Sequence, residues 1–578
     1  MDTNLRGMQL PSPRFRQAPL PKELCSVRGF HSLQTFFPTL SSLYNLKGKH
    51  KESVWLDSKW RIRGIDISGT SGPCFLKLVP NVDVSGDMSP SETRSQSAYM
   101  KVTHLLDPIR WMKGKYSLPK QNGLPWDTQT WAPAWTKLQD SWNQAYVEAV
   151  ASYALGRLRD EGISPHFNEF YGAFCARADI YRYNLTEEIG EYRTSPWFWR
   201  GQKNSLFKLC ILDRVHPGAD VPEDIMDEYL REPSVLDSDS DSDSGSEAGD
   251  ISVDLDSDDD EVIDVKISDD MASLHSDGMS DISFTENNQR SESESSDASS
   301  EEVDDTYKIY AELNDFPVML IAIEQNSGTM DELLDSIELV GAKHGTPEWE
   351  IRWSAWLFQV IAALTVAQAM FGFTHNDLHT NNIVWIPTSE EFLYYTLKSG
   401  ATFKVPTFGK LFRIIDYGRS IFTINGTQFI SDDFRDGNDA GGQYAFEPLT
   451  EGADPEIPPN PSFDLCRLSV SLFEALFPEE PENCESKEVL SSEEGLTVLK
   501  SVSPLYNCLW SWMVDDNGEN VLVNADGSER FPNFDLYNHI ATSIHNAIPS
   551  QQFTHPAFDQ FQVNPSEVGD VKKWQLFI

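Results

Sequence analysis

Apolar and polar positions divide this chain into a strand-rich first part and a helix-rich last part. Residues 54–80 contain the apolar runs WRIRGIDIS and PCFLKLV, separated by the turn cluster SGTSG, which predicts short strands. Residues 145–159 carry apolar side chains at helical spacing and are followed by Gly162, which predicts a helix and its end. HFNEFYGAFC and VMLIAIE (318–324) predict two more strands.

The last part begins with Thr346-Pro347-Glu348, a helix start with a capping residue and proline at the first position. The apolar pattern carries this helix to about residue 370. The polar loop HNDLHTNN, the strands IVWI and FRII, and a helix from about Asp464 follow. This order predicts an α+β chain with two lobes, a mainly β small lobe and a mainly α large lobe.

Charge is unevenly distributed. The chain has 578 residues and a formal net charge of -44. More than half of that charge lies in residues 232–305, where Ser, Asp and Glu dominate and Lys266 and Arg290 are the basic residues. Such a segment has too little apolar surface to fold, so we expect a disordered insertion. We expect it to be phosphorylated or to bind basic partners, or else to be a solvated insertion without a specific role.

Composition also bounds the partners and the compartment. A strongly acidic chain disfavours nucleic acid and anionic membrane surfaces as partners. The seven cysteines form no C-x-x-C pair, which is typical of a reducing compartment. No apolar run reaches roughly 18 residues, so no membrane-spanning helix is expected, and the first 30 residues lack the apolar centre of a secretory signal. We therefore expect a soluble intracellular protein, in the cytoplasm or nucleus, without membrane insertion.

The strongest chemical signal is the loop HNDLHTNN. It contains Asp377 and Asn382 at the spacing H-x-D-L-x-x-x-N, and Asp416-Tyr417-Gly418 follows the strand FRII. A carboxylate can accept the proton of an attacking hydroxyl, and amide and carboxylate oxygens are ligands that Mg²⁺ prefers. This predicts phosphoryl transfer, with Asp377 as base and with Asn382 and Asp416 as metal ligands.

Two other interpretations use the same residues. Asp377 and Asn382 could cap a turn, with Asp416 to Gly418 forming a hairpin bend. His375 and His379 are four apart, as in a zinc hydrolase, but Asn376 stands where the general-base glutamate is needed. The asparagine-rich context also predicts a loop, whereas the zinc motif requires a helix.

These motifs resemble the eukaryotic protein-kinase-like superfamily. His379 stands where most protein kinases have lysine, a substitution also seen in haspin-like and other atypical kinases. Several segments between about 360 and 540 are similar to kinase-like proteins of large DNA viruses and algae. Those segments are HNDLHTNNIVWIPT, YYTLKSG, FKVPTFGKLFRIIDYGRSI, GGQYAFEP, NPSFDLCRLSVSLFE and GSERFPNFDLY. The resemblance implies a bilobal kinase fold that binds ATP and Mg²⁺, with Asp377 and His379 in the catalytic loop.

The resemblance also requires small-lobe residues that hold the nucleotide. Lys77 is the candidate lysine, with a solvent-facing lysine as the alternative. Glu148 is its candidate partner, with a solvated helix face as the alternative. Backbone groups from Glu324 to Asn326 are expected to hold the adenine. Asp464 is expected to brace the catalytic loop or to cap its own helix.

Several features depart from a standard protein kinase. Lys77 is not preceded by a G-x-G-x-x-G loop, because Gly64, Gly69 and Gly72 have a different spacing. Asn376 replaces the arginine that would pair with an activation-loop phosphate. An inserted segment between Asp377 and Asp416 predicts a hairpin, and Phe446-Glu447-Pro448 is the nearest match to A-P-E.

We expect a flexible arm (1–30), a small lobe (31–325) interrupted by the acidic insertion (232–305), a large lobe (326–565) and a tail (566–578). The first functional hypothesis is a protein kinase that uses ATP and Mg²⁺ and phosphorylates Ser or Thr of a protein substrate in preference to Tyr. The alternatives are a pseudokinase that acts as a scaffold, suggested by the missing glycine loop, and a small-molecule kinase of the aminoglycoside or choline type.

Overall fold

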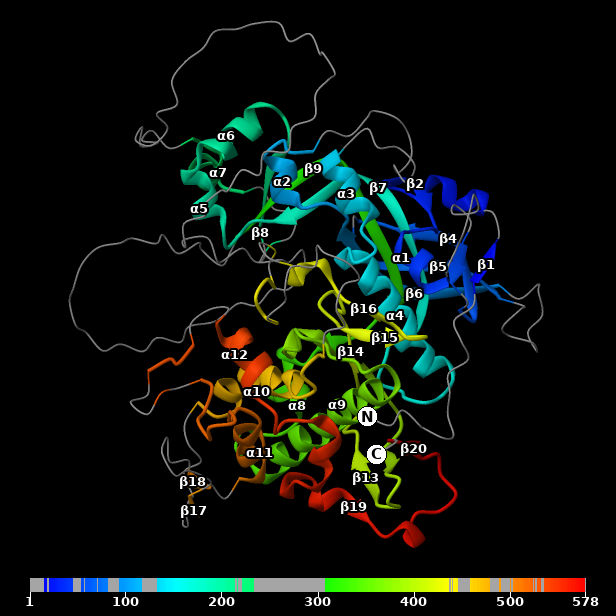
Figure 1. The fold of residues 1–578 in the computed structure, drawn as a ribbon, viewed down its shortest axis with the longest axis vertical. Helices are drawn as coiled ribbons and strands as arrows, with labels where there is room; N and C mark the ends of the chain where they lie inside the picture. Colours follow the sequence, from blue (N-terminus) through cyan, green and yellow to red (C-terminus); the bar gives the residue numbers. More distant parts are fainter. Residues whose placement is uncertain are drawn as a thin grey trace, which may run out of the picture.

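An antiparallel sheet forms the first half of the computed structural model, and a group of helices forms the second half (Figure 1). The structure describes residues 15–17, 20–44, 54–56, 58–69, 71–81, 93–116, 132–213, 216, 221–232, 307–435, 438, 440–444, 458–478, 488–489, 499–500, 503–522, 524, 528–531 and 535–576. The acidic insertion beyond residue 232 and Phe446-Glu447-Pro448 lie outside this range.

Seven strands make up the main sheet, in the order β2-β7-β9-β6-β5-β4, with β8 also paired to β9. All the pairings are antiparallel. The longest strand, β9, reaches from Tyr307 to Glu324, well beyond the predicted 318–324. The other strands are β2 (Phe30–Gln34), β4 (Trp60–Ile67), β5 (Gly72–Pro80), β6 (Arg94–His104), β7 (Phe170–Asn184) and β8 (Lys208–Asp213).

Helix α4 (Gln144–Asp160) packs against β7 and β9. Asn143 caps its first turn through its side chain, and most of its residues are buried. The helix predicted at 145–159 is therefore confirmed. Shorter helices surround this part of the chain: α1 (Thr39–Tyr44), α2 (Pro108–Met112), α3 (Ala132–Gln139), α5 (Ile189–Thr194), α6 (Pro196–Lys203) and α7 (Glu223–Leu230).

The second half is built around α9 (Pro347–Phe371), the predicted long helix. Thr346 caps it by accepting a hydrogen bond from Trp349, and Gly372 ends it in the left-handed conformation. By length and composition this helix could cross a membrane, contrary to the sequence expectation, but 83% of its 18-residue apolar window is buried in the protein. A core helix meets the same criterion. Further helices are α8 (Ile337–Val340), α10 (Phe463–Leu476), α11 (Pro504–Trp512) and α12 (Asp535–Ser543).

Small sheets connect the two halves and support the polar loop. One has the order β10-β11-β14. In sequence, β10 precedes residues 375–382, whereas β11 and β14 follow them. The hairpin predicted between Asp377 and Asp416 is present as an antiparallel pair of strands, β12 and β13. The bounds are β10 (Gly328–Thr329), β11 (Ile383–Pro387), β12 (Phe392–Thr396), β13 (Thr402–Pro406), β14 (Lys410–Ile414), β15 (Phe422–Ile424) and β16 (Thr427–Phe429).

Described segments towards both ends of the chain pack against the rest of the protein. Leu24, Val27 and Phe30 are buried, so this part of the expected arm packs into the core. In the tail, β20 (Trp574–Gln575) pairs with β12, and Leu576 is buried. Apolar side chains dock these segments because burying them removes apolar surface from water.

Candidate active site

The loop that follows α9 is held by Asp464, at the start of α10. Its carboxylate accepts hydrogen bonds from the backbone N–H of His375, at 2.9 and 3.0 Å, and from that of Asn376, at 3.0 Å. Asn376 has a φ of 63°, and its side chain donates to the Arg419 carbonyl at 3.0 Å. The bracing role expected for Asp464 is thus present in the contacts. Burial raises the pKa of this carboxyl to about 6, against the hydrogen bonds that lower it.

Asp377 lies between a tyrosine and an arginine. Tyr537, on α12, donates its hydroxyl to Asp377 Oδ1 at 3.2 Å and receives a hydrogen bond from Arg467 Nε at 2.8 Å. Arg419 Nη1 lies 3.8 Å from the same Asp377 oxygen. Burial alone would raise the pKa of Asp377, but the surrounding cations, Arg419 foremost, lower it to about 2. The carboxylate is therefore ionised and able to accept a hydrogen bond or a proton.

Asn382 has a defined amide orientation. Its Nδ2 donates to the Asp377 carbonyl at 2.9 Å and lies 2.9 Å from His379 Nε2. Both amide hydrogens are therefore used, which leaves Oδ1 as the atom offered to the cavity. Burial lowers the pKa of His379 to about 4, so its ring is neutral and can accept from Asn382. His379 orients Asn382 in this arrangement.

His375 is engaged in the fold. Its Nε2 donates to the Ile415 carbonyl at 2.8 Å, and its Nδ1 accepts from the Asp377 N–H at 3.3 Å. Both ring nitrogens are thus occupied, which argues against the zinc interpretation of His375 and His379. Tyr417 packs edge-on against this ring, with centroids 5.9 Å apart.

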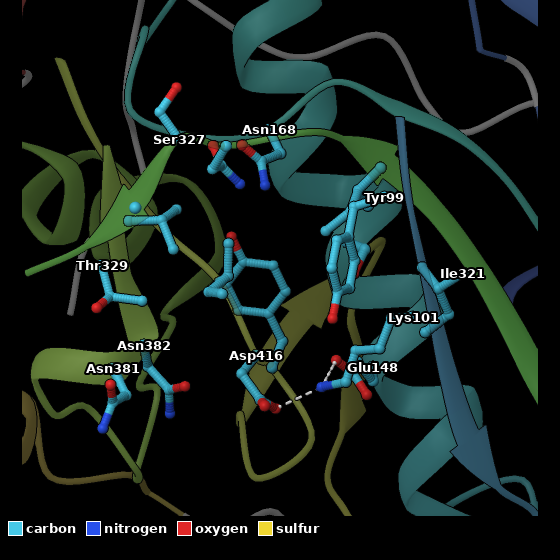
Figure 2. Close-up of a pocket in the computed structure, with 17 residues that line it drawn as sticks. Tyr99, Lys101, Glu148, Asn168, Ile321, Ser327, Thr329, Asn381, Asn382 and Asp416 are labelled. Carbon is cyan, nitrogen blue, oxygen red and sulfur yellow. Dashed lines mark hydrogen bonds and ion pairs between the residues drawn. The ribbon is translucent and has the colours of Figure 1, made fainter. Parts of the chain in front are cut away.

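A single lysine joins the two halves of the site. Lys101, on β6, lies 2.5 Å from Glu148 Oε1 and 2.9 Å from Asp416 Oδ1, and Figure 2 shows both contacts. Burial raises the pKa of Glu148 and would raise that of Asp416, but the Lys101 ammonium lowers the pKa of Asp416. Lys101 therefore remains protonated between two acidic side chains.

The structure does not bring Lys77, the lysine expected from the sequence, to the cavity. Its side chain is exposed on β5, and its partner across the sheet is Ser95, at the far end of β6 from Lys101. The two positions are roughly 20 Å apart along the strands at about 3.3 Å per residue. Glu148 lies in the pocket as expected, but its partner is Lys101. The sequence signal that could have identified Lys101 is the segment AYMK, in which a lysine follows apolar residues. Lys101 is also closer to Glu148 in sequence than Lys77 is.

Glu324 does not line the cavity, and its side chain is engaged elsewhere. Its carboxylate lies 2.8 Å from Arg413 and 3.6 Å from Arg159, and its N–H donates to the Glu169 carbonyl at 3.0 Å. The Glu324 side chain, at the end of β9, therefore belongs to an ion-pair network with Arg413 and Arg159. Asn326 does line the pocket, as expected.

The cavity has a volume of about 360 Å³ and runs between the sheet and the polar loop (Figure 2). One part is polar, with Lys101, Glu148, Asp416 and Asn382, and the rest has mostly apolar walls. The lining residues are Tyr99, Lys101, Glu148, Ser152, Asn168, Ile321, Ile323, Asn326, Ser327, Gly328, Thr329, Asn381, Asn382, Val384, Ile415, Asp416 and Tyr417.

Hairpin β4–β5 lies next to β6 in the sheet. Its turn contains Gly69, and Gly72 begins β5 with a φ of 109°, a conformation that glycine adopts readily. Its glycine spacing differs from G-x-G-x-x-G, and no described residue of this hairpin lines the cavity.

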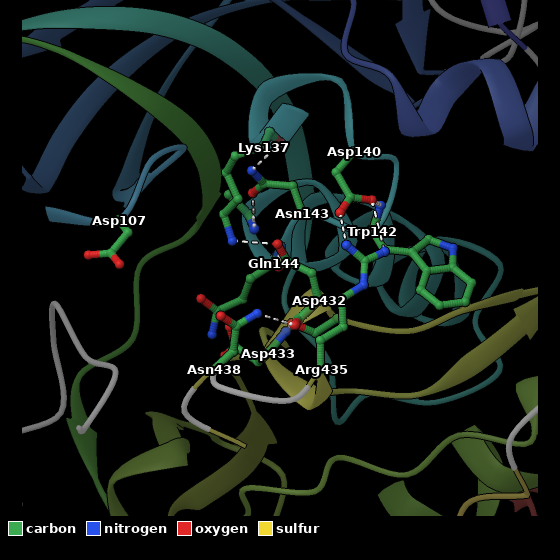
Figure 3. A network of polar contacts seen from close by, with 12 residues as sticks. Asp107, Lys137, Asp140, Trp142, Asn143, Gln144, Asp432, Asp433, Arg435 and Asn438 are labelled. Atoms are coloured by element: carbon green, nitrogen blue, oxygen red, sulfur yellow. Dashed lines mark hydrogen bonds and ion pairs between the residues drawn. The ribbon is translucent and has the colours of Figure 1, made fainter. Parts of the chain in front are cut away.

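A second polar network fastens the segment after Asp416 to α4 (Figure 3). Asp432 forms an ion pair with Lys137 on α3, and its Oδ1 accepts from the Gln144 N–H at 2.9 Å. The Asp432 N–H donates to the Trp142 carbonyl at 2.8 Å. Gln144 begins α4, the helix that carries Glu148, so the network attaches this segment to the start of that helix. The sequence offered no signal for it.

Comparisons with known proteins place part of this chain near one group of kinases. A stretch of 93 residues, 16% of this chain, is 40% identical to the serine/threonine-protein kinase haspin of Bos taurus. A stretch of 61 residues, 11% of this chain, is 44% identical to haspin of Mus musculus. These matches span 12% and 8% of the length of the two relatives. No family model matches the chain. The similarity to kinases is therefore partial and covers a small part of this chain.

Proposed function

We propose that this chain is a protein kinase that uses ATP and Mg²⁺ and transfers the γ-phosphate to a serine or threonine hydroxyl of a protein. We also propose that its two halves are the small and large lobes of a kinase fold. The observation that carries the proposal is the contact of Lys101 with both Glu148 and Asp416, in a cavity that also contains Asn382. The partial relatives are serine/threonine-protein kinases, which supports a Ser/Thr acceptor.

Each residue has a role that follows from its contacts. Asp377 is ionised and would orient the acceptor hydroxyl and receive its proton. Lys101 would hold phosphate oxygens, with Glu148 keeping the lysine in place. Backbone groups near Asn326 would hold the adenine.

The residues present also fit a magnesium ion. Asn382 Oδ1 and the Asp416 carboxylate are hard oxygen ligands on the same cavity. When bound, Mg²⁺ would neutralise charge on the phosphates. His379 contributes by keeping the Asn382 oxygen turned to the cavity.

The test is phosphate transfer from labelled ATP with Mg²⁺ to the chain itself and to a panel of proteins. We expect labelled protein with the wild type and a loss of at least about 100-fold for Asp377→Asn, because the base is removed. Asp66→Asn, at an exposed position of β4, is the matched control and should keep full activity. Thermal unfolding checks that each variant folds.

Labelled protein that persists in a folded Asp377→Asn variant would contradict the assignment of the base. A thermal shift with Mg-ATP but no label on any protein would indicate a pseudokinase or a small-molecule kinase.

A further inference from the structure

Two asparagine side chains lie in the cavity away from Lys101. Asn168, which precedes β7, is 6% exposed, and Asn326 follows β9. Among the described residues, neither the Asn168 Nδ2 nor the Asn326 Oδ1 has a hydrogen-bond partner, although both atoms are buried. A buried donor without a partner costs about 1–3 kcal/mol, so this arrangement calls for a ligand group.

The orientation of the Asn168 amide is determined by its surroundings. Arg413 Nη1 donates to Asn168 Oδ1 at 3.2 Å, and Arg413 is itself held by Glu324 at 2.8 Å. A flipped amide would bring two donors together, so Nδ2 must be the atom on the other side. Figure 2 shows the Asn168 amide nitrogen directed into the cavity.

Asn326 has the complementary polarity. Its Nδ2 contacts the Glu324 carbonyl at 3.5 Å, which leaves Oδ1 as an acceptor. Two residues that line the cavity therefore have a buried atom without a partner among the described residues, a donor on Asn168 and an acceptor on Asn326.

The walls between these asparagines and Lys101 are suited to a flat ring. Tyr99 and Ile323 are opposite each other across β6 and β9, as are Lys101 and Ile321. Ile415 and Val384 line the cavity as well. Apolar walls of this kind accept an aromatic base, while the charged groups around Lys101 accept phosphate.

We propose that Asn168 Nδ2 donates a hydrogen bond to a ring nitrogen of the adenine base, and that Asn326 Oδ1 accepts one from its amino group. Adenine carries an amino donor beside ring-nitrogen acceptors, which matches the two asparagines. The inference rests on the proposed function, because it concerns the nucleotide of the same cavity. It adds side-chain base recognition to the backbone contacts expected near Asn326.

The experiment compares ATP with 7-deaza-ATP and 1-deaza-ATP, each of which lacks one ring-nitrogen acceptor. Dissociation constants with Mg²⁺ are measured by calorimetry for the wild type and Asn168→Leu. We expect the wild type to bind one of the two analogues about tenfold more weakly than ATP. Asn168→Leu should bind ATP about tenfold more weakly than the wild type and should no longer distinguish that analogue.

Two controls accompany this comparison. Asn168→Leu removes the acceptor for Arg413 and could fail to fold, so Asn168→Asp is measured in parallel. Asp keeps an oxygen for Arg413 but removes the donor, and we expect it to weaken ATP binding by at least tenfold. Asn204→Leu, at an exposed position after α6, should bind all three nucleotides like the wild type.

The outcomes separate this inference from the proposed function. Equal binding of all three nucleotides by the wild type overturns the role of Asn168. So does a preference for ATP over the analogue that is unchanged in Asn168→Leu or Asn168→Asp. A wild type that binds none of the nucleotides overturns the proposed function, and the inference with it.

Discussion

Lys101 and Glu148 form a close ion pair, 2.5 Å apart, between β6 and α4. Lys101 also contacts Asp416, so under the proposed function its ammonium would hold the phosphates of ATP between the sheet and the polar loop. We predict that Lys101→Met lowers phosphate transfer by at least about 100-fold, since the charge that would stabilise the phosphates is removed. The measurement is kcat/KM with labelled ATP.

Lys77→Met is the matched control for this experiment. The Lys77 side chain is exposed on β5, so the same substitution there should leave kcat/KM within about twofold of the wild type. Loss of activity in Lys77→Met, with Lys101→Met still active, would reverse the assignment.

Tyr537 connects Arg467 to the proposed base. Its hydroxyl donates to Asp377 Oδ1 and accepts from Arg467, so it helps to orient the carboxylate. We predict that Tyr537→Phe lowers kcat by about tenfold, the effect of one hydrogen bond, and changes the KM for ATP little. Steady-state kinetics at varied ATP separates the two parameters.

Two results would contradict this positioning role for Tyr537. An increase in kcat/KM for the protein substrate would mean that the hydroxyl obstructs the acceptor position. Phosphate on Tyr537, detected by mass spectrometry, would make the residue a substrate. Tyr394→Phe, on β12 and outside the pocket, should behave like the wild type.

Lys137 and Asp432 form a largely buried ion pair that fastens the segment after Asp416 to α3. Asp432→Leu leaves Lys137 without its charge partner, and we predict a loss of about 3 kcal/mol in the free energy of unfolding. The double variant Lys137→Leu/Asp432→Leu should lose less than the sum of the two single variants. Denaturant titration gives the free energy of unfolding of the wild type, the two single variants and the double variant. Additive losses in that free energy would show that Lys137 and Asp432 are not coupled.

His166 predicts a pH dependence of stability. Its ring is buried between the Phe412 carbonyl and the Tyr395 hydroxyl, each 2.8 Å away, and burial lowers its pKa to about 4. The unfolded chain binds a proton at His166 near pH 6.5, whereas the folded chain does not. This contribution to stability is therefore present above pH 6.5 and decreases as the pH falls towards 4.

From pH 7 to pH 5, His166 should account for a loss of about 2 kcal/mol in the free energy of unfolding. We predict that His166→Gln, which has no titrating ring, shows a correspondingly flatter pH profile over this interval. Chemical denaturation at both pH values measures the difference. Parallel profiles for the two proteins would contradict a neutral His166.

Local sequence was sufficient to predict the polar loop and the helices around it. Asp377 and Asn382 are five residues apart, and the Asn382 side chain donates to the Asp377 carbonyl, so a local contact helps to set their mutual position. The start of α9 at Pro347 followed from its capping residues. Glu148 was found because its helix has a clear apolar period.

Residues brought together by the sheet were harder to predict. Lys77 and Lys101 both lie in apolar strands, and only the pairing of β5 with β6 decides which of them reaches Glu148. The ion pair of Glu324 with Arg413 on β14 likewise joins residues far apart in sequence, and no local pattern predicts it.

The sequence by itself therefore determined the polar loop that contains Asp377 and Asn382 and the helix that carries Glu148. These features depend mainly on residues close together along the chain. Only the tertiary structure decided that Lys101 contacts Glu148 and Asp416, that Tyr537 contacts Asp377 and that Asn168 lines the cavity. Strand register and the packing of distant segments set those contacts, and neither leaves a local pattern in the sequence.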